Sequence, residues 1–295
     1  MQKFYLENLR LKVVISEQGA ELCSILSKEN GHEYLWNADE TYWKRHAPVL
    51  FPIVGSLNKG AVNIDGTYYP MSQHGFARDM DFKMVKQPDG KEILFRLEYN
   101  EETLKNYPYK FALEIGYKLD GYKIETTWRV INLDDKEIHF QIGGHPAFMC
   151  PLAKQGKQSE YMLNFDTDKN LKYSLLNSEG LLSSEGGELE NDGSGLVKID
   201  EHMFDKDALI IEGSQASKVT ICKPDGMSYI TVGFEAPLFG IWSPAGKGAP
   251  FICIEPWYGR ADREGFAGNI AEREYDNCIK PSETFEKSYY IELEV

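Results

Sequence analysis

Residues 111–130 read FALEIGYKLDGYKIETTWRV, and this stretch decides the fold of the 295-residue chain. On either side of Asp120-Gly121, nearly every second side chain is large and apolar or aromatic. A period of two is typical of a strand with one buried and one solvent-facing side. Asp-Gly between two such runs supplies the positive φ angles that a type I′ turn requires. The stretch therefore predicts an antiparallel hairpin.

The same alternation recurs outside this hairpin, in residues 9–15, 93–99 and 289–295. Asp-Gly pairs also stand between other β-patterned runs, at residues 65–66, 89–90, 192–193 and 225–226. Repeated Asp-Gly pairs between alternating segments indicate an all-β protein.

Helical patterning is scarce. Asn100–Tyr107 fits a short helix and Glu201–Lys206 a single turn. Residues 154–191 are rich in Ser, Gly, Asn and Glu, which favours weak strands and loops over a domain linker, because strand patterning resumes on both sides. We therefore expect one domain over residues 1–295, a large antiparallel β-sandwich with few short helices.

The composition excludes several classes of function. The chain has 46 Asp and Glu against 32 Lys and Arg, a net charge of −14, which disfavours binding to nucleic acid or to an anionic membrane. No apolar run approaches the roughly 20 residues of a membrane span. The five cysteines are widely spaced and form neither a disulfide framework nor a zinc motif. We expect a soluble cytoplasmic protein without a metal or cofactor; a homodimer stays open.

Three clusters contain polar side chains among glycine, proline and aromatic residues. Polar side chains in such surroundings are unusual for a β-sandwich and make these clusters candidates for a functional site. In the second, a histidine stands between a flexible Gly pair and a Pro. In the third, Glu255 ends an apolar run, and a buried carboxylate is costly unless it is paired or tuned for proton transfer. The clusters are His74-Gly75-Phe76-Ala77-Arg78, Gly143-Gly144-His145-Pro146 and Phe251-Ile252-Cys253-Ile254-Glu255-Pro256-Trp257.

An imidazole and a carboxylate together make an acid–base pair. One group donates a proton to a ring oxygen while the other removes one from a hydroxyl, which opens a cyclic hemiacetal without a metal or cofactor. No second acid has comparable surroundings, which disfavours glycoside hydrolysis, and G-x-S-x-G is absent. Taken singly, a histidine is more often structural than catalytic. Trp242 fits either the core or a platform for the apolar face of a sugar.

At these clusters the chain resembles the aldose 1-epimerase (galactose mutarotase) superfamily, and most of all its LacX-type branch. The matching segments follow the family's order over most of the chain, and the combination is more specific than any single segment. They are Arg45–Gly55, His74–Arg78, Gly144–Phe148, Asp207–Ile210 and Glu255–Asp262.

The resemblance implies a galactose mutarotase-like supersandwich with a sugar cleft on one open face. It implies an isomerase of carbohydrate metabolism in which His145 is the general acid, protonating the ring oxygen. Glu255 is then the general base, and the two groups act on opposite sides of one pyranose. The further sugar-contacting positions that it implies are His74, Arg45, Arg78 and Asp207.

Two alternatives stay open beside an aldose 1-epimerase. In related hexose-6-phosphate epimerases, the positions of Arg45 and Arg78 carry cationic contacts, and guanidinium matches phosphate in bidentate geometry. The ligand is then a sugar phosphate rather than a free sugar. The second alternative is a carbohydrate-binding or sensor protein without turnover, which keeps the cleft but not the tuned acid–base pair.

Overall fold

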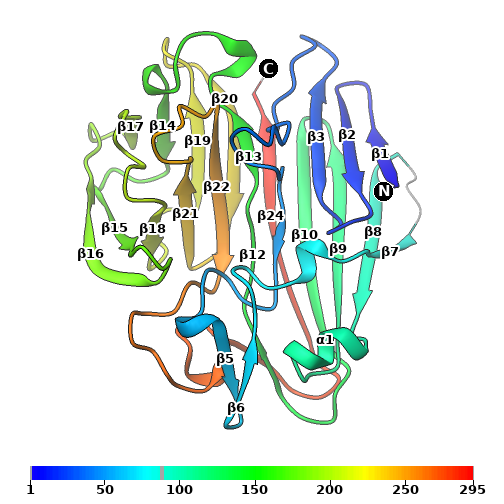
Figure 1. Cartoon of the computed structure of the whole chain (residues 1–295). Coiled ribbons are helices and arrows are strands. Elements are labelled where there is room, and N and C mark those ends of the chain that lie inside the picture. Colours follow the sequence, from blue (N-terminus) through cyan, green and yellow to red (C-terminus); the bar gives the residue numbers. More distant parts are fainter. Residues whose placement is uncertain (1, 87–89, 295) are drawn as a thin grey trace.

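The computed structural model describes residues 2–86 and 90–294, whose regular secondary structure consists mostly of antiparallel strands (Figure 1). The largest sheet has nine strands. In spatial order they are β17 (Leu196–Lys198), β14 (Met162–Phe165), β19 (Lys218–Cys222), β20 (Ser228–Phe234), β24 (Thr284–Leu293), β10 (Lys123–Asn132), β9 (Phe111–Asp120), β8 (Glu92–Glu98) and β7 (Lys83–Lys86).

A second sheet, of eight strands, carries most of the site described below. Its order is β16 (Leu182–Leu189), β15 (Leu171–Leu176), β18 (Leu209–Glu212), β21 (Leu238–Trp242), β22 (Phe251–Tyr258), β12 (Ile142–Gly144) and β4 (Val49–Leu50), with β13 (Ala147–Met149) also paired to β22. Three smaller sheets are β1–β2–β3 (Lys3–Glu7, Leu11–Ser16, Leu22–Ser27), β5–β6 (Ala61–Ile64, Thr67–Pro70) and β11–β23 (Ile138–Phe140, Asn277–Ile279).

The hairpin expected at residues 111–130 is confirmed, with its turn displaced by one residue. Asp120 pairs with Lys123, so Gly121 and Tyr122 form the two-residue loop. Only Gly121 has a positive φ, 57°, which fits a type II′ turn rather than type I′. At Asp65-Gly66 both residues have positive φ, as a type I′ turn requires. Residue 89 of another expected turn lies outside the described residues.

The one α-helix of the described residues, α1 (Glu101–Asn106), lies where the sequence predicts it. The Asn100 side chain accepts hydrogen bonds from the backbone N–H groups of Glu102 and Thr103, which satisfies donors that the first turn leaves free. Five 3-10 turns complete the helical content: η1 (Asn58–Gly60), η2 (Ala77–Asp79), η3 (Leu152–Lys154), η4 (Gln158–Glu160) and η5 (Ile270–Glu272).

Two local predictions are wrong. Glu201–Lys206 forms turns and no helix, because its backbone bonds are separate i→i+3 contacts that end at Asp207, where φ is +75°. Leu9 does not share the buried face of β2: it lies in the bend before that strand and is 93% exposed. Residues 154–191 do form short strands and loops, with β14 to β16 among them.

The main hydrophobic core lies between the sheets and draws on all three larger ones. The eight-stranded and three-stranded sheets form the near layer in Figure 1, and the nine-stranded sheet lies behind them. No helix of residues 2–86 and 90–294 is long and apolar enough to cross a membrane.

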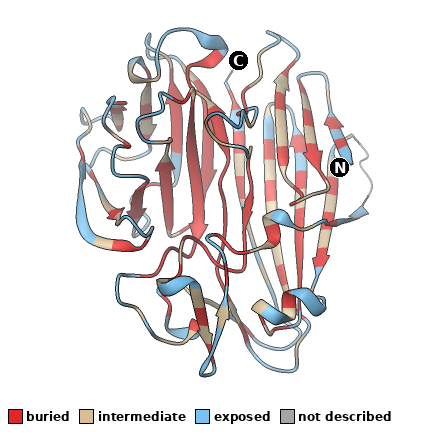
Figure 2. Cartoon of the chain, in the orientation of Figure 1, coloured by how far each residue is buried: buried red, intermediate tan, exposed pale blue. Residues whose placement is uncertain are grey.

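Strand β22 is buried along its whole length (Figure 2). Ile252 and Ile254 face the main core. The alternate residues Cys253 and Trp257 belong to two small clusters on the other face of the sheet, and Glu255 lies between them in sequence. Because side chains alternate along a strand, Glu255 projects from the sheet face that points away from the core.

Candidate active site

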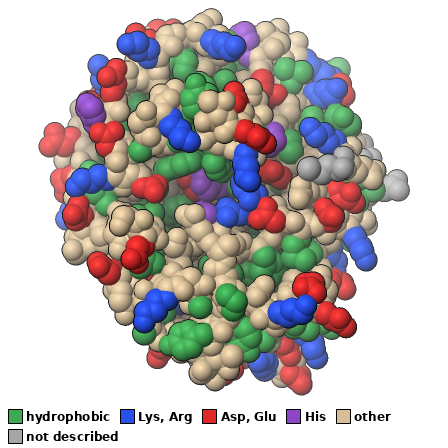
Figure 3. Space-filling model, in the orientation of Figure 1, with side chains coloured by type: hydrophobic (Ala, Val, Ile, Leu, Met, Phe, Trp, Pro, Cys, Tyr) green, Lys and Arg blue, Asp and Glu red, His purple; other side chains and the backbone are tan. Residues whose placement is uncertain are grey.

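A pocket of about 220 Å³ lies on this outer face of the eight-stranded sheet. In Figure 3, histidine side chains lie at the bottom of a hollow with Lys or Arg side chains beside them. Six of the seven residues that the sequence singles out line the pocket: His74, Arg78, His145, Asp207, Trp242 and Glu255. The seventh, Arg45, is not among the lining residues.

His145 and Glu255 are direct neighbours in the pocket. Nε2 of His145 lies 3.1 Å from Oε2 of Glu255, although the contact lacks hydrogen-bond geometry. Both residues are buried, and Nδ1 of His145 also has no hydrogen-bond partner. The sequence analysis placed the two groups on opposite sides of a sugar ring; the structure places them side by side.

The backbone around His145 holds the imidazole over β22. His145 stands in the two-residue connection between β12 and β13, where its N–H donates to the Pro48 carbonyl over 3.1 Å. The next residue, Pro146, accepts from the N–H of Ile254 over 3.2 Å. Pro146 follows His145 and Ile254 precedes Glu255, so this backbone hydrogen bond holds the imidazole beside the Glu255 carboxyl.

Burial shifts the pKa values of this pair in opposite directions. Desolvation and the positive charge of Arg78 lower the pKa of His145 to about 3. Desolvation and the negative charge of Asp207 raise the pKa of Glu255 well above its usual value. Both shifts disfavour an ion pair and favour a neutral imidazole beside a neutral carboxyl when no ligand is bound.

Two tryptophans surround the His145 ring. Trp43 stacks on it with ring centroids 4.7 Å apart and an interplanar angle of 28°. Trp242 meets the same ring edge-on at 5.5 Å and 86°. Their ring faces exclude water from the imidazole, which strengthens electrostatic interactions inside the pocket.

A third indole, that of Trp257, lies over two glycines of neighbouring strands. Trp257 pairs with Gly143 of β12, and a Cβ on Gly143 would come within 2.6 Å of its ring. A Cβ on Gly240 of β21 would also come within 2.6 Å of the indole. The two glycines leave room for the ring, which lines the pocket next to Glu255.

His74 is held by the backbone in a left-handed conformation, with φ of 65°, a region that His adopts more readily than most residues. Its Nδ1 accepts a hydrogen bond of 3.0 Å from the N–H of Gly55. Gly75 follows with φ of 72° and lies so close to the Phe51 carbonyl that a Cβ would clash at 2.2 Å. The segments around Phe51 and His74 therefore fit together only through these backbone conformations.

Two cations near the pocket differ in their contacts. The Arg78 guanidinium lines the pocket, donates to the Gln73 carbonyl over 2.6 Å, and has a buried Nε without a hydrogen-bond partner. Desolvation and the charge of Arg45 lower the pKa of Arg78 to about 10. Arg45 instead donates to the Asp79 carboxylate over 2.9 Å. It still acts electrostatically on His145, lowering its pKa.

Asp207 lies at the pocket and is exposed, with its Oδ1 accepting from the N–H of Ala208 over 2.8 Å. The lining residues that were not predicted to contact a ligand include Trp43, Gln73 and Trp257. Trp43 stands two residues before Arg45, and Trp257 belongs to the third polar cluster, so proximity to the predicted site residues was the available signal.

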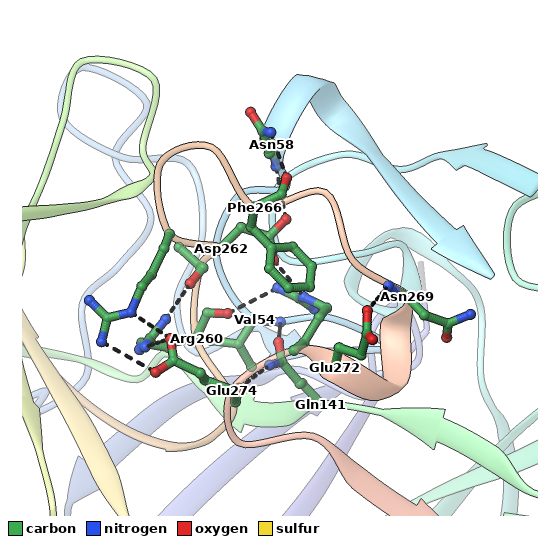
Figure 4. A network of polar contacts seen from close by, with 12 residues as sticks. Val54, Asn58, Gln141, Arg260, Asp262, Phe266, Asn269, Glu272 and Glu274 are labelled. Carbon is green, nitrogen blue, oxygen red and sulfur yellow. Dashed lines mark hydrogen bonds and ion pairs between the residues drawn. The ribbon is translucent and has the colours of Figure 1, made fainter. Parts of the chain in front are cut away.

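A polar network behind the pocket fixes the segment that holds His74 (Figure 4). Gln141 accepts from the Val54 N–H over 3.2 Å and donates to the Glu274 carbonyl over 2.9 Å. Asp262 accepts from the Asn58 N–H over 2.9 Å. Gln141 thus holds Val54, and Asp262 of the fifth matching segment holds Asn58.

Two buried arginines complete this network. Arg260 pairs with Glu212 over 2.8 Å and with Glu274, while Arg273 pairs with Asp262 over 2.7 Å. Each buried guanidinium thus has a carboxylate partner, although Nη1 of Arg273 has no hydrogen-bond partner.

Three groups of potential metal ligands occur among the described residues. One of them, His145, Cys253 and Glu255, lies in the pocket, with ligand atoms within 4.8 Å of one another. It offers one nitrogen, one sulfur and one oxygen donor, a set that zinc accepts. The sequence-based expectation that the protein needs no metal or cofactor stays a prediction.

Fold and site together define a β-sandwich protein with a small-molecule pocket built around an acid–base pair. Residues 2–266 match the profile of the aldose 1-epimerase family. The chain belongs to the aldose 1-epimerase family, as the sequence motifs predict. This membership supports sugar epimerase or mutarotase activity.

Several relatives cover nearly the whole chain. Protein LacX of Lactococcus lactis subsp. lactis, in its chromosomal and plasmid forms, is 33% identical over 302 residues, which cover 98% of this chain and 98% of that protein. A galactose mutarotase related enzyme from Lactobacillus acidophilus is 32% identical, with a TM-score of 0.93 over 100% of this chain and 98% of that one. A galactose mutarotase-like protein from Lactobacillus casei is 31% identical, with a TM-score of 0.92 over 99% and 100%.

Proposed function

We propose that the protein is an aldose 1-epimerase that interconverts the α and β anomers of a sugar in this pocket. The observation that carries the proposal is the 3.1 Å contact between His145 and Glu255. The ring oxygen and the anomeric hydroxyl oxygen are bonded to the same carbon, so the two groups that exchange protons with them must be neighbours.

The proposed chemistry depends on how the sugar changes the protonation of His145 and Glu255. In the complex with sugar, the anomeric hydroxyl donates to the Glu255 carboxylate and the ring oxygen accepts from the His145 imidazolium. Both hydrogen bonds favour the ionic form of the pair, because hydrogen bonding to a charged form stabilises it.

Ring opening then transfers both protons. Glu255 takes the hydroxyl proton, the C1 carbonyl forms, the bond from C1 to the ring oxygen breaks, and that oxygen takes the proton of His145. The resulting neutral carboxyl and neutral imidazole are the forms that burial favours. Rotation about the bond between C1 and C2, followed by the reverse transfers, gives the other anomer.

The remaining polar groups of the pocket suit sugar hydroxyls. Because Nδ1 of His74 accepts from Gly55, its proton resides on Nε2, which makes His74 a hydrogen-bond donor. Asp207 supplies acceptors and Arg78 supplies donors at the pocket wall. Trp242 offers an aromatic edge or face to the apolar side of a pyranose.

The test is the rate of anomer exchange, followed by NMR or polarimetry from a pure anomer. Glu255→Gln and His145→Gln keep the size of the side chain but remove its proton transfer, and each should lower the rate by about 10²–10⁴-fold. Glu98→Gln, on the exposed end of β8, is the control and should leave the rate unchanged. Wild-type exchange at the uncatalysed rate for every sugar tried, or full activity in both pocket variants, contradicts the proposal.

A phosphorylated sugar is the second candidate substrate, favoured by one observation: the Arg78 guanidinium lines the pocket and its buried Nε has no hydrogen-bond partner, with the Asp79 carboxylate 3.9 Å away. A thermal-shift comparison of hexoses with their 6-phosphates separates the two, because a bound ligand raises the melting temperature. Stabilisation by phosphate esters alone, lost in Arg78→Gln, selects the phosphorylated substrate. Stabilisation by sugars without catalysed exchange indicates a binding or sensor protein.

A further inference from the structure

The ribbon formed by β11 and β23 brings four chemically active side chains to one face, apart from the residues that line the pocket. His139 of β11 pairs directly with Cys278 of β23. Glu137 lies two residues before His139, and Asp276 lies two residues before Cys278. Because side chains two apart in a strand point to the same side, the register alone places all four together.

The distances agree with this register. Sγ of Cys278 lies 3.8 Å from Nε2 of His139 and 3.8 Å from Oε2 of Glu137. Ligand atoms of the three residues all lie within 4.8 Å of one another. Glu137 and Cys278 are exposed, so an ion reaches them directly from solvent.

These separations are close to those around a tetrahedral zinc ion. With a Zn–S bond of about 2.3 Å and a Zn–N bond of about 2.0–2.1 Å, tetrahedral geometry sets sulfur and nitrogen about 3.6 Å apart. The observed distance between Sγ of Cys278 and Nε2 of His139 is 3.8 Å. A small side-chain rotation is enough to bring the two atoms to the separation expected around zinc. Thiolate, imidazole and carboxylate are the three ligand types that zinc takes in proteins.

An independent feature supports a metal here: the other ring nitrogen of His139 already has a carboxylate partner. Nδ1 lies 2.6 Å from Oδ2 of Asp276, whose side chain is only 11% exposed. With the proton on Nδ1, the lone pair of Nε2 is directed away from Asp276 and toward the Cys278 side. Histidines that bind metals almost always donate their second N–H to a carboxylate, a carbonyl or water in this way.

The charge around the cysteine separates a metal site from a reactive thiol. The carboxylates of Glu137, Asp276 and Glu283 surround the Cys278 thiol with negative charge. Such surroundings oppose a free thiolate nucleophile. The same carboxylates attract a divalent cation, which displaces the thiol proton when it binds.

We propose that Glu137, His139 and Cys278 bind a Zn²⁺ ion, with Asp276 orienting the histidine and the fourth coordination position open to water or a further ligand. Asp276 is a positioning residue, since it touches the imidazole and not the ion. The site is independent of the sugar pocket and of the function proposed for it.

Zinc affinity of the full-length protein, measured by competition with a chromogenic chelator, tests the proposal together with Co²⁺ absorption spectra. The wild type should take up one Zn²⁺ at this site, and its Co²⁺ form should show a thiolate-to-cobalt charge-transfer band. Cys278→Ser should abolish that band, and Cys278→Ser and His139→Gln should each weaken Zn²⁺ binding at least tenfold. Asp276→Asn should weaken it about 10–100-fold while retaining the band, because the ligands remain.

A matched control comes from a second histidine–carboxylate pair without a cysteine. Nδ1 of His202 lies 2.9 Å from Oδ2 of Asp205 on an exposed turn, and His202→Gln should change nothing. Circular dichroism and melting curves show that each variant is folded. Wild-type affinity in folded Cys278→Ser, or loss of binding in Cys23→Ser instead, overturns the proposal, because Glu21, Cys23 and His46 form the competing group.

Discussion

The backbone N–H of Gly55 donates a 3.0 Å hydrogen bond to Nδ1 of His74. This contact fixes which ring nitrogen carries the proton, so a loop amide decides that His74 offers a donor to the pocket. Two substitutions separate this function from the strain of the backbone. Asn tolerates the left-handed conformation, and its Oδ1 can accept from the N–H of Gly55. Val disfavours the left-handed conformation and has no side-chain atom that can accept this hydrogen bond.

We therefore expect His74→Asn to fold with nearly wild-type stability but to bind sugar more weakly, with KM raised more than kcat is lowered. His74→Val should lose about 1–3 kcal/mol of stability from the backbone conformation alone. Urea unfolding and steady-state kinetics measure the two effects. Equal stability of the two variants contradicts the account of the loop.

The stability of His145→Gln relative to wild type should rise as the pH falls. The pKa of His145 is about 3 in the folded protein and near 6.5 in the unfolded chain, so protons bind the unfolded state as the pH falls below about 6.5. The wild type thereby loses about 2 kcal/mol between pH 8 and pH 5 that the variant keeps. Urea titrations of both proteins at the two pH values give the difference directly.

Glu255→Gln should show the opposite trend. Because burial raises the pKa of Glu255, the folded state holds that proton more tightly than the unfolded chain, and stability falls as the pH rises above about 4.5. The amide does not titrate, so the variant gains on the wild type between pH 5 and pH 8. A resting imidazolium–carboxylate pair would reverse the sign of both trends, and such a reversal would refute the proton placement described above.

Gly240→Ala tests the place of the Trp257 indole. The new Cβ would come within 2.6 Å of the ring, which must move from the pocket wall. We expect a loss of about 1–3 kcal/mol in stability and weaker sugar binding. Gly116→Ala on β9 is the control, because the nearest atom to its Cβ is the flexible end of Leu94, at 3.3 Å, and the other contacts lie at 3.9 Å. Unchanged sugar affinity in Gly240→Ala would show that the indole does not shape the pocket.

Arg273→Met tests the network of Figure 4. The variant leaves the Asp262 carboxylate, 4% exposed, without its cation, which should cost about 3–5 kcal/mol of stability. Lys206→Met breaks an ion pair with Glu185 in which both side chains are more than half exposed, and its effect on the melting temperature should be negligible. Similar melting temperatures for the two variants would contradict the structural role of Arg273.

The sequence predicts the sandwich well because its signals are local. Alternation in residues 111–130 and Asp-Gly turns depend on neighbours within a few positions, and the structure reproduces the alternation and, at Asp65-Gly66, the expected turn type. The prediction that Leu9 lies on the buried face is wrong because alternation does not mark where a strand begins. The turn at Gly121 moves by one residue because the register of two strands, not the dipeptide alone, selects the loop.

The site is predicted less completely, for reasons that lie outside local sequence. His145 and Glu255 are found because a carboxylate at the end of an apolar run is unusual. The place of the Trp257 indole in the pocket wall is not predicted, because it depends on glycines in two other strands. Arg45 pairs with Asp79, 34 positions away, a choice made by tertiary packing that no local pattern encodes.

Strand β22 presents Ile254 to the core and Glu255 to the pocket, so the Glu255 carboxyl cannot shift without disturbing the interior. Trp43, His74, Arg78 and Asp207 instead come from segments that connect strands. In the proposed mechanism the base is thereby anchored to the least adaptable part of the molecule, while most of the groups suited to sugar hydroxyls come from connections between strands. Exchanging the connections that carry Trp43 or Asp207 between relatives should change which sugar is bound and leave the position of Glu255 intact.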